Sequence, residues 1–301
     1  MNTIEAFEND IGLQLEFLKT FKGQKRLGNK NQKNLVFCGS GDSLISAMLA
    51  ESFSDLRARS LDPLDLIKNK KLADGKKVFF ISISGNTVSN VKAAKVISDT
   101  IAVTRNPSSR LGRSCNKVVQ LQYNDSKILT SGSVGFLASM LTCISFVYKF
   151  EIKNAKSLLE QAKIQTEKLG LKNRVFFLGN QYTFPVCMYA AAKMYEIHGM
   201  DAHYERIEQF SHMGLFSAKK GDIVIIFEKP NKHNKQLALN LEHLGMNVVN
   251  PSIRGGLISQ VVFYTFVSQL LALAHAKRKN IKNCYFVLEK KLRDASSSMI
   301  Y

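Results

Sequence analysis

Residues 78–87 read Val-Phe-Phe-Ile-Ser-Ile-Ser-Gly-Asn-Thr, and this stretch decides the fold class. The apolar run Val78–Ser82 predicts a buried strand, because β-branched and aromatic side chains favour strands. Hydroxyl residues and a glycine follow at once, and a helical pattern begins near Val88. A buried strand, a short turn and a helix are the repeating unit of α/β proteins with a parallel sheet.

The same alternation occurs elsewhere in the chain and then restarts. Two further buried runs, Leu35–Cys38 and Ile101–Val103, belong to the first half, and helical patterns at about 133–149 and 153–169 follow. Three strand segments of the first half reappear in the same order 140–146 residues later. The pairs are 34–39 with 174–179, 77–82 with 222–227, and 100–103 with 246–249. Two copies of one α/β unit are therefore predicted.

These patterns predict two three-layer αβα domains of the flavodoxin-like type, each with a parallel five-stranded sheet. We expect a helical N-terminal segment over residues 1–30 and a first domain over 31–152. The second domain is expected over 153–282, and a tail over 283–301.

A candidate phosphate site lies at the turn after the strand at 78–82. Glycine lets the backbone turn tightly, and hydroxyls and free N–H groups at the start of a helix bind anions. A second Gly-Ser turn follows Leu35–Cys38 and would meet the first at the same sheet edge. The predicted phosphate-binding residues are Ser40, Ser82, Ser84, Gly85, Asn86 and Thr87. Helix capping alone is the alternative. Neither a P-loop nor a dinucleotide-binding glycine pattern is present.

A second candidate site lies on the helix predicted from Pro185 to Gly199. Lys193 and Glu196 stand three residues apart and share one face of this helix. A solvated surface ion pair is the alternative interpretation. His198 and His275 are expected in the core or at an interface, with a sugar-binding role for His275 as the alternative.

The two turns and the repeat resemble the SIS (sugar isomerase) domain family over about residues 30–291. Ser82-x-Ser84-Gly85-x-Thr87 is similar to the family's phosphate-binding loop. Segments 104–111 and 263–272 are also similar to family stretches. The tandem arrangement resembles the isomerase half of glucosamine-6-phosphate synthase and the archaeal phosphoglucose/phosphomannose isomerases. The resemblance implies two tandem SIS domains.

The resemblance also implies catalytic residues. Lys193-x-x-Glu196 resembles the helix that carries the family's catalytic glutamate, and His212 follows Glu196 at the family's spacing. It implies that Glu196 moves a proton between C1 and C2, with Lys193 stabilising the enediolate or tuning the carboxylate. It implies that His212 opens the sugar ring within the partner subunit's site, which makes a homodimer with a shared active site. Lys291 corresponds to a lysine over the substrate, and Lys290 competes for this role.

The implied activity is that of a phosphosugar isomerase, which interconverts aldose and ketose (or amino-sugar) hexose 6-phosphates through a cis-enediol(amine). The segment Thr130–Ser139 lacks the acid that the synthase has there, and Tyr189 replaces another acid. Both departures weaken amino-sugar recognition and favour a neutral hexose phosphate. Deamination of glucosamine 6-phosphate and a non-catalytic sugar-phosphate-binding protein are the alternatives.

The charge balance points to an anionic partner. Lys and Arg number 42 against 24 Asp and Glu in 301 residues, which gives a formal charge of +18. The basic residues are spread along the chain without an aromatic-interleaved basic motif, so nucleic acid is disfavoured. A phosphorylated sugar is the better-defined anion.

The remaining composition bounds cofactors and location. Five scattered cysteines predict neither a disulfide framework nor a zinc ribbon and favour a reducing cytoplasm. No cofactor or metal is expected, since the histidines lack metal-ligand spacing. Four acids in the first sixteen residues argue against a signal peptide. No apolar run reaches membrane-spanning length, and Val261–Ala276 is expected to be a buried helix.

Overall fold

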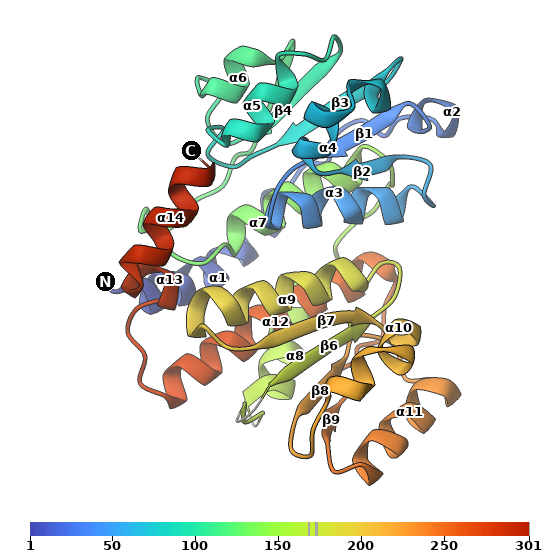
Figure 1. Ribbon diagram of the computed structural model, residues 1–301, viewed down its shortest axis with the longest axis vertical. Coiled ribbons are helices and arrows are strands. Elements are labelled where there is room, and N and C mark those ends of the chain that lie inside the picture. The colour runs from blue at the N-terminus through green and yellow to red at the C-terminus, as the bar shows by residue number, and fades with distance from the viewer. Residues whose placement is uncertain (168, 172–173, 301) are drawn as a thin grey trace. The chain divides into compact units, whose positions relative to one another are not determined.

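The structure is a computed structural model that describes residues 1–167, 169–171 and 174–300. The chain divides into two compact units, each built on one parallel sheet (Figure 1). The first-sheet unit comprises Glu16–Asp125, Gly132–Glu151 and Lys290–Tyr301. The second-sheet unit comprises Met1–Leu15, Ser126–Ser131 and Ile152–Glu289.

The sheet of the first-sheet unit has five parallel strands in the order β2-β1-β3-β4-β5. Its central strands β1, β3 and β4 are apolar and almost wholly buried, as parallel strands covered on both faces must be. The strands are β1 (Leu35–Cys38), β2 (Arg59–Leu61), β3 (Lys77–Ile81), β4 (Thr100–Thr104) and β5 (Lys117–Gln120).

Side chains alternate between the two faces of this sheet. Val36 and Phe80 pack on one face with Val91 of α5, whereas the Phe37 and Phe79 rings stack with centroids 4.9 Å apart. Phe79 also packs against Phe146, just beyond α7. The helices of this unit are α2 (Asn29–Gln32), α3 (Asp42–Phe53), α4 (Pro63–Lys68), η1 (Lys70–Ala73), α5 (Val88–Ala94), α6 (Arg110–Ser114), α7 (Val134–Ser145) and α14 (Lys290–Ile300).

The sheet of the second-sheet unit repeats the strand order of the first. Its strands run β7-β6-β8-β9, all parallel, which matches β2-β1-β3-β4. They are β6 (Val175–Gly179), β7 (Ala202–Arg206), β8 (Ile223–Ile226) and β9 (Asn247–Val249). The α/β class and the internal repeat predicted from the sequence are confirmed, since the strands of each predicted pair occupy equivalent places in the sheet order. The register matches Lys77 with Ile223, one residue later than the sequence pairing of 77–82 with 222–227.

The expected fifth strand of the second sheet is wrong for the part of the chain that the structure describes. After β9 the chain reads Asn-Pro-Ser-Ile-Arg-Gly-Gly over 250–256, and proline lacks the donor that a ladder needs. The N–H and carbonyl groups of Ser252 both bond to the side-chain amide of Gln165, at 2.9 and 3.0 Å. Backbone groups paired in this way cannot extend the sheet.

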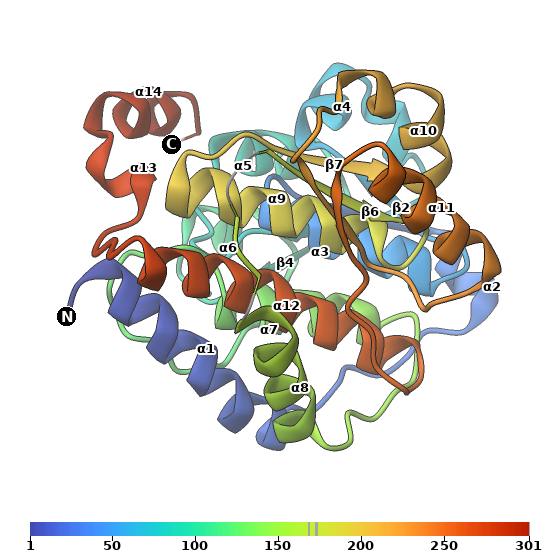
Figure 2. The same cartoon turned by 90° about the horizontal axis from the view of Figure 1, so that it is seen from below.

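Helices cover both faces of the second sheet. α9 packs on β6 and β7 and against α12, and α8 packs on α12 (Figure 2). On the other face, Ile207 and Phe210 of α10 and Leu241 of α11 pack with β6 and β8 residues. The helices are α1 (Thr3–Thr20, in this unit as far as Leu15), α8 (Ala155–Glu167), α9 (Phe184–His198), α10 (Ile207–His212), η2 (Gly214–Ser217), α11 (Lys232–His243), α12 (Leu257–Arg278) and α13 (Tyr285–Leu288).

Helix α12 is long and apolar enough to cross a membrane by length and composition. Most of it is buried within the second-sheet unit, which is the property of a core helix. The expected buried helix at Val261–Ala276 is therefore confirmed.

Candidate functional site

In each unit the two central strands end side by side, β1 with β3 and β6 with β8. The chain leaves these neighbouring strands in opposite directions across the sheet, which makes a crevice at their carboxyl ends. The predicted phosphate-binding residues follow β1 and β3, so the structure places them at such a crevice in the first-sheet unit.

The loop after β3 is held by its own hydroxyls. Ser82 Oγ accepts the Gly85 N–H at 3.1 Å and lies 3.1 Å from Thr87 Oγ1. Thr87 stands at the N-cap of α5 without a side-chain capping bond. The alternative that these hydroxyls merely cap the helix is therefore wrong for Thr87.

Position 85 of this loop favours glycine over every other residue type. Its φ is +67°, in the left-handed region. A Cβ there would lie 2.0 Å from Ser109 Oγ, so any side chain would clash with the segment behind the loop. The loop backbone is thus pressed against Ser109 with no room between them.

The segment after β4 supports the loop from behind. Arg105 N–H donates to the Ile83 carbonyl at 3.1 Å, and Leu111 N–H donates to the Gly85 carbonyl at 2.8 Å. The Arg110 N–H approaches Asn86 Oδ1 at 3.5 Å. Three backbone donors therefore fix the loop, and Ser84 remains its most exposed hydroxyl residue.

The guanidinium of Arg105, which lies in the segment behind the loop, is already paired within the protein. Arg105 pairs with both oxygens of Asp125, and its guanidinium lies 4.6 Å from the Tyr123 ring centroid. The donors that the candidate phosphate site (the loop after β3, called the phosphate cradle below) offers to an anion are therefore hydroxyls and backbone N–H groups. Ser40, in the turn after β1, is half-buried at the carboxyl end of the neighbouring strand.

Glu196 and Lys193 lie on α9 of the second-sheet unit, with Lys193 Nζ 2.7 Å from Glu196 Oε2. The side chain of Lys193 is fully buried, and that of Glu196 is 35% exposed. This differs from a solvated surface pair, because the cation has no access to water. Ser131 Oγ donates to the same Oε2 at 2.5 Å.

Lys193 is in contact with a network of buried polar side chains. Its Nζ lies 4.7 Å from the Tyr189 ring centroid, a cation–π distance. The Tyr189 hydroxyl accepts from Gln269 Nε2 at 3.0 Å, and Gln269 Oε1 accepts from Gln14 Nε2 at 2.7 Å. Gln14 of α1, Gln269 of α12 and Tyr189 of α9 thus form the network next to Lys193. Lys193 in turn pairs with Glu196.

His212, Lys290 and Lys291 are exposed. His212 ends α10 and lies 3.1 Å from Glu208 Oε1 through its Nε2, with both side chains about 70% exposed. Lys290 and Lys291 begin α14 in the first-sheet unit. Their catalytic roles stay predictions.

His198 and His275 pack against each other between α9 and α12, with ring centroids 4.7 Å apart. His198 Nε2 lies 3.0 Å from the Ala272 carbonyl, and its Nδ1 has no hydrogen-bond partner among the described residues. Burial lowers the pKa of His198 to about 4. Burial and the charges of Arg278 and Lys279 also lower the pKa of His275. These contacts are those of core histidines.

Ser131 and Ser109 are site residues that the sequence analysis missed. Ser131 belongs to the hydroxyl-rich run Thr130-Ser-Gly-Ser, which was noted only for the acid it lacks. Its hydrogen bond to Glu196 is a long-range contact, so spacing along the chain gives no signal for it. Among the described residues, no group of three His, Cys, Asp or Glu side chains could hold a metal ion.

The family model of the SIS domain matches residues 168–253. These residues include all four strands of the second sheet, β6 to β9, so the match covers the sheet of the second-sheet unit. No curated protein sequence matches the chain.

Solved structures extend the likeness to nearly the whole chain. Glucosamine-6-phosphate deaminase from Thermotoga maritima is 20% identical, with a TM-score of 0.70 over 93% of this chain and 95% of that one. The C-terminal domain of glucosamine-fructose-6-phosphate aminotransferase from Francisella tularensis is 16% identical, with a TM-score of 0.68 over 92% and 94%. Tagatose-6-phosphate ketose/aldose isomerase from Escherichia coli is 14% identical, with a TM-score of 0.67 over 93% and 90%. Residues 168–253 thus match the SIS domain family, and the chain as a whole has the fold of these three proteins.

Proposed function

We propose that this protein is a phosphosugar isomerase that acts on a hexose 6-phosphate. The observation that carries the proposal is the state of Glu196: a carboxylate at the end of a buried polar network, held by Lys193 and Ser131 and still in reach of solvent. A base that is fixed on one side and open on the other suits proton transfer to a bound substrate.

One oxygen of the Glu196 carboxylate has no hydrogen bond or ion pair with the part of the chain that the structure describes. Both anchoring contacts fall on Oε2, so Oε1 is the oxygen that would meet the substrate. In the proposed reaction Oε1 removes the C2 proton of the open-chain aldose, and the C2–H electrons form the C1–C2 double bond of a cis-enediol(ate). The electrons of the C1 carbonyl move to O1, which takes up the proton that the C2 hydroxyl gives up. The same Oε1 returns the first proton to C1, so that C2 becomes the carbonyl carbon of the ketose. Lys193 provides positive charge beside the developing enediolate.

The loop after β3 is proposed to hold the phosphate. Its backbone N–H groups, Ser84 and Thr87 would surround the phosphate oxygens, and Gly85 allows the close approach of the backbone. Ser40 would contribute from the neighbouring turn. Ser82 would act through the loop, because its hydroxyl accepts the Gly85 N–H.

His212 and Lys291 complete the proposal. His212 would open the sugar ring in the partner subunit's site, which suits its exposed position at the end of α10 and requires a homodimer. Lys291 would approach the substrate from the C-terminal tail. The five cysteines are free, which suits a reducing cytoplasm as the proposed location.

Deamination of glucosamine 6-phosphate is the second candidate, and the likeness to the Thermotoga deaminase favours it. The proton transfer from C2 to C1 would be the same. Water would then hydrolyse the ketimine at C2, so that ammonia leaves and fructose 6-phosphate forms.

One experiment separates these functions. The purified protein is incubated in deuterated water with hexose 6-phosphates and with glucosamine 6-phosphate, with and without ammonia. Deuterium at C1 or C2 with ketose formation is expected, and release of ammonia would select the deaminase. Binding of a sugar phosphate without any exchange would overturn both in favour of a sensor.

A further inference from the structure

The second sheet carries a site equivalent to the phosphate cradle, but with a carboxylate in it. Lys77 of β3 pairs with Leu35, and Ile223 of β8 pairs with Val175. Five residues further along each strand, the register places Glu228 at the position of Ser82.

The turns after β1 and β6 share the same packing, which supports this equivalence. A Cβ on Gly39 would lie 2.7 Å from Ser43 Cβ, and a Cβ on Gly179 would lie 2.6 Å from Thr183 Oγ1. The two crevices therefore have the same backbone plan. They differ at one position, where the first-sheet unit has the hydroxyl of Ser82 and the second-sheet unit has the carboxylate of Glu228.

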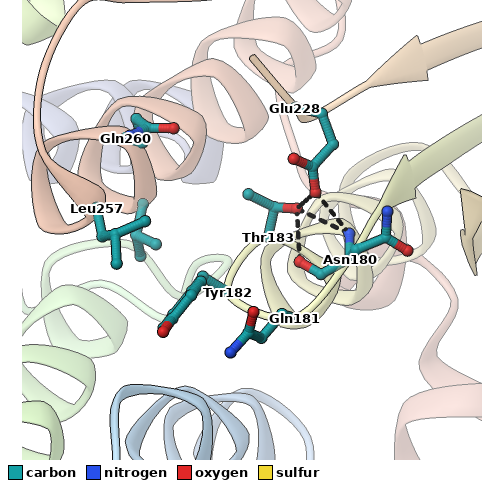
Figure 3. Close-up of a pocket in the computed structure, with 8 residues that line it drawn as sticks. Asn180, Gln181, Tyr182, Thr183, Glu228, Leu257 and Gln260 are labelled. Carbon is teal, nitrogen blue, oxygen red and sulfur yellow. Dashed lines mark hydrogen bonds between the residues drawn. The ribbon is translucent and has the colours of Figure 1, made fainter. Parts of the chain in front are cut away.

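Glu228 uses one of its two oxygens within the protein. Its Oε1 accepts the Asn180 N–H at 2.9 Å and the Thr183 hydroxyl at 2.8 Å (Figure 3). Its Oε2 has no hydrogen-bond or ion-pair partner among the residues that the structure describes. The adjacent cation, Lys229, donates instead to the Gly255 carbonyl at 3.0 Å.

A cavity of about 160 Å³ lies beside this carboxylate. Its walls are polar on the side of β6 and β8 and partly apolar on α12, where Leu257 and Gln260 face it (Figure 3). Gln260 is buried, and its side-chain Nε2 donates to the Gly255 carbonyl at 3.0 Å, whereas its Oε1 has no hydrogen-bond partner within the described ranges. The lining residues are Asn180, Gln181, Tyr182, Thr183, Glu228, Leu257, Gln260 and Val261.

The volume and the free acceptors define the ligand class. A protein cavity of about 150 Å³ holds benzene, so six heavy atoms fit here. A carboxylate oxygen and an amide oxygen both accept hydrogen bonds, and the carboxylate repels phosphate. We propose that this cavity of the second-sheet unit binds a small protonated amine that also carries hydroxyl groups. The proposal does not depend on the isomerase activity.

Two probes with six heavy atoms each test the charge requirement. 2-Amino-1,3-propanediol carries an ammonium group where glycerol carries a hydroxyl. Binding is followed by NMR of labelled methyl groups, with Leu257 and Val261 reporting on this cavity and Ile83 on the phosphate cradle. We expect millimolar binding of the amine at Leu257 and Val261, without a shift at Ile83. Glycerol should bind at least about fivefold more weakly.

Two variants locate the interaction. Glu228→Gln keeps the size and the Oε1 acceptor, so the bonds from Asn180 and Thr183 remain while the charge is lost. It should weaken amine binding at least about fivefold and leave glycerol binding unchanged. Leu257→Phe, at a partly exposed rim position, should reduce binding of both probes by filling the cavity.

Three results would each overturn the proposal. Methyl shifts could be absent up to about 100 mM amine. Glycerol could bind as tightly as the amine, or Glu228→Gln could bind the amine as the native chain does. Glu228 would then serve only to hold the start of α9.

Discussion

At the scale of single residues, the Lys193–Glu196 pair is asymmetric. The ammonium of Lys193 is fully buried, whereas the carboxylate of Glu196 reaches solvent. A buried ion that loses its partner is costly, whereas a carboxylate in contact with water is rehydrated. The two partners should therefore respond differently to removal.

Glu196→Ala is expected to lower the free energy of unfolding by about 3 kcal/mol, because a buried ammonium loses its carboxylate. Lys193→Met should cost about 1 kcal/mol or less, since Met fills the space and Glu196 is hydrated. Urea unfolding of the two variants measures the difference. Equal costs, or a larger cost for Lys193→Met, would contradict this picture.

Gly85 offers a second test at this scale. Gly85→Ala should destabilise the protein by about 3 kcal/mol, through its positive φ and the clash with Ser109. Gly75→Ala is the matched control, since Gly75 also has a positive φ (+66°) but has nothing within 4 Å of an added Cβ. It should cost about 1 kcal/mol. Thermal or urea unfolding compares them, and similar costs would show that the loop is not pressed against Ser109.

At the scale of elements, the contact between α9 and α12 depends on two neutral histidines. The pKa of His198 falls from 6.5 to about 4 on folding, because burial disfavours the charged ring. The unfolded chain therefore takes up this proton first as the pH falls. The stabilisation is complete above pH 6.5 and is lost progressively down to about pH 4.

Replacing His198 should flatten this pH dependence. His198→Gln keeps a donor towards Ala272 but does not titrate. Relative to this variant, the native chain should lose up to about 3 kcal/mol of stability between pH 6.5 and 4. Urea midpoints measured across this range give the comparison. Parallel curves for the two proteins would show that His198 is already charged or exposed in the folded state.

Sequence patterns predicted the elements better than the contacts between them. The strands at 35–38 and 78–82 and the helices beginning near Val88 and Pro185 follow from local apolar patterns. The second sheet ends after β9 because Gln165 holds Ser252, and this contact joins residues 87 positions apart. The bond from Ser131 to Glu196 spans 65 positions and was invisible for the same reason.

At the scale of the whole molecule, the charge of +18 exceeds what the candidate sites use. The proposed phosphate site offers neutral donors, and Arg105 is paired with Asp125. The affinity for a hexose 6-phosphate should therefore change less than about threefold between 50 and 300 mM salt. Calorimetric titration at several salt concentrations tests this. A tenfold loss would indicate that unpaired lysines or arginines bind the phosphate.

The central claim is that Glu196 transfers the proton, and the exchange rate at C1 and C2 tests it most directly. The rate of deuterium incorporation into the preferred hexose 6-phosphate is compared between the native chain, Glu196→Gln and the control Glu160→Gln. Glu160 also pairs with a lysine of its own helix, but on an exposed surface. We predict a loss of at least about a hundredfold in Glu196→Gln and none in Glu160→Gln. Exchange at the native rate in a folded Glu196→Gln variant would contradict the proposed mechanism.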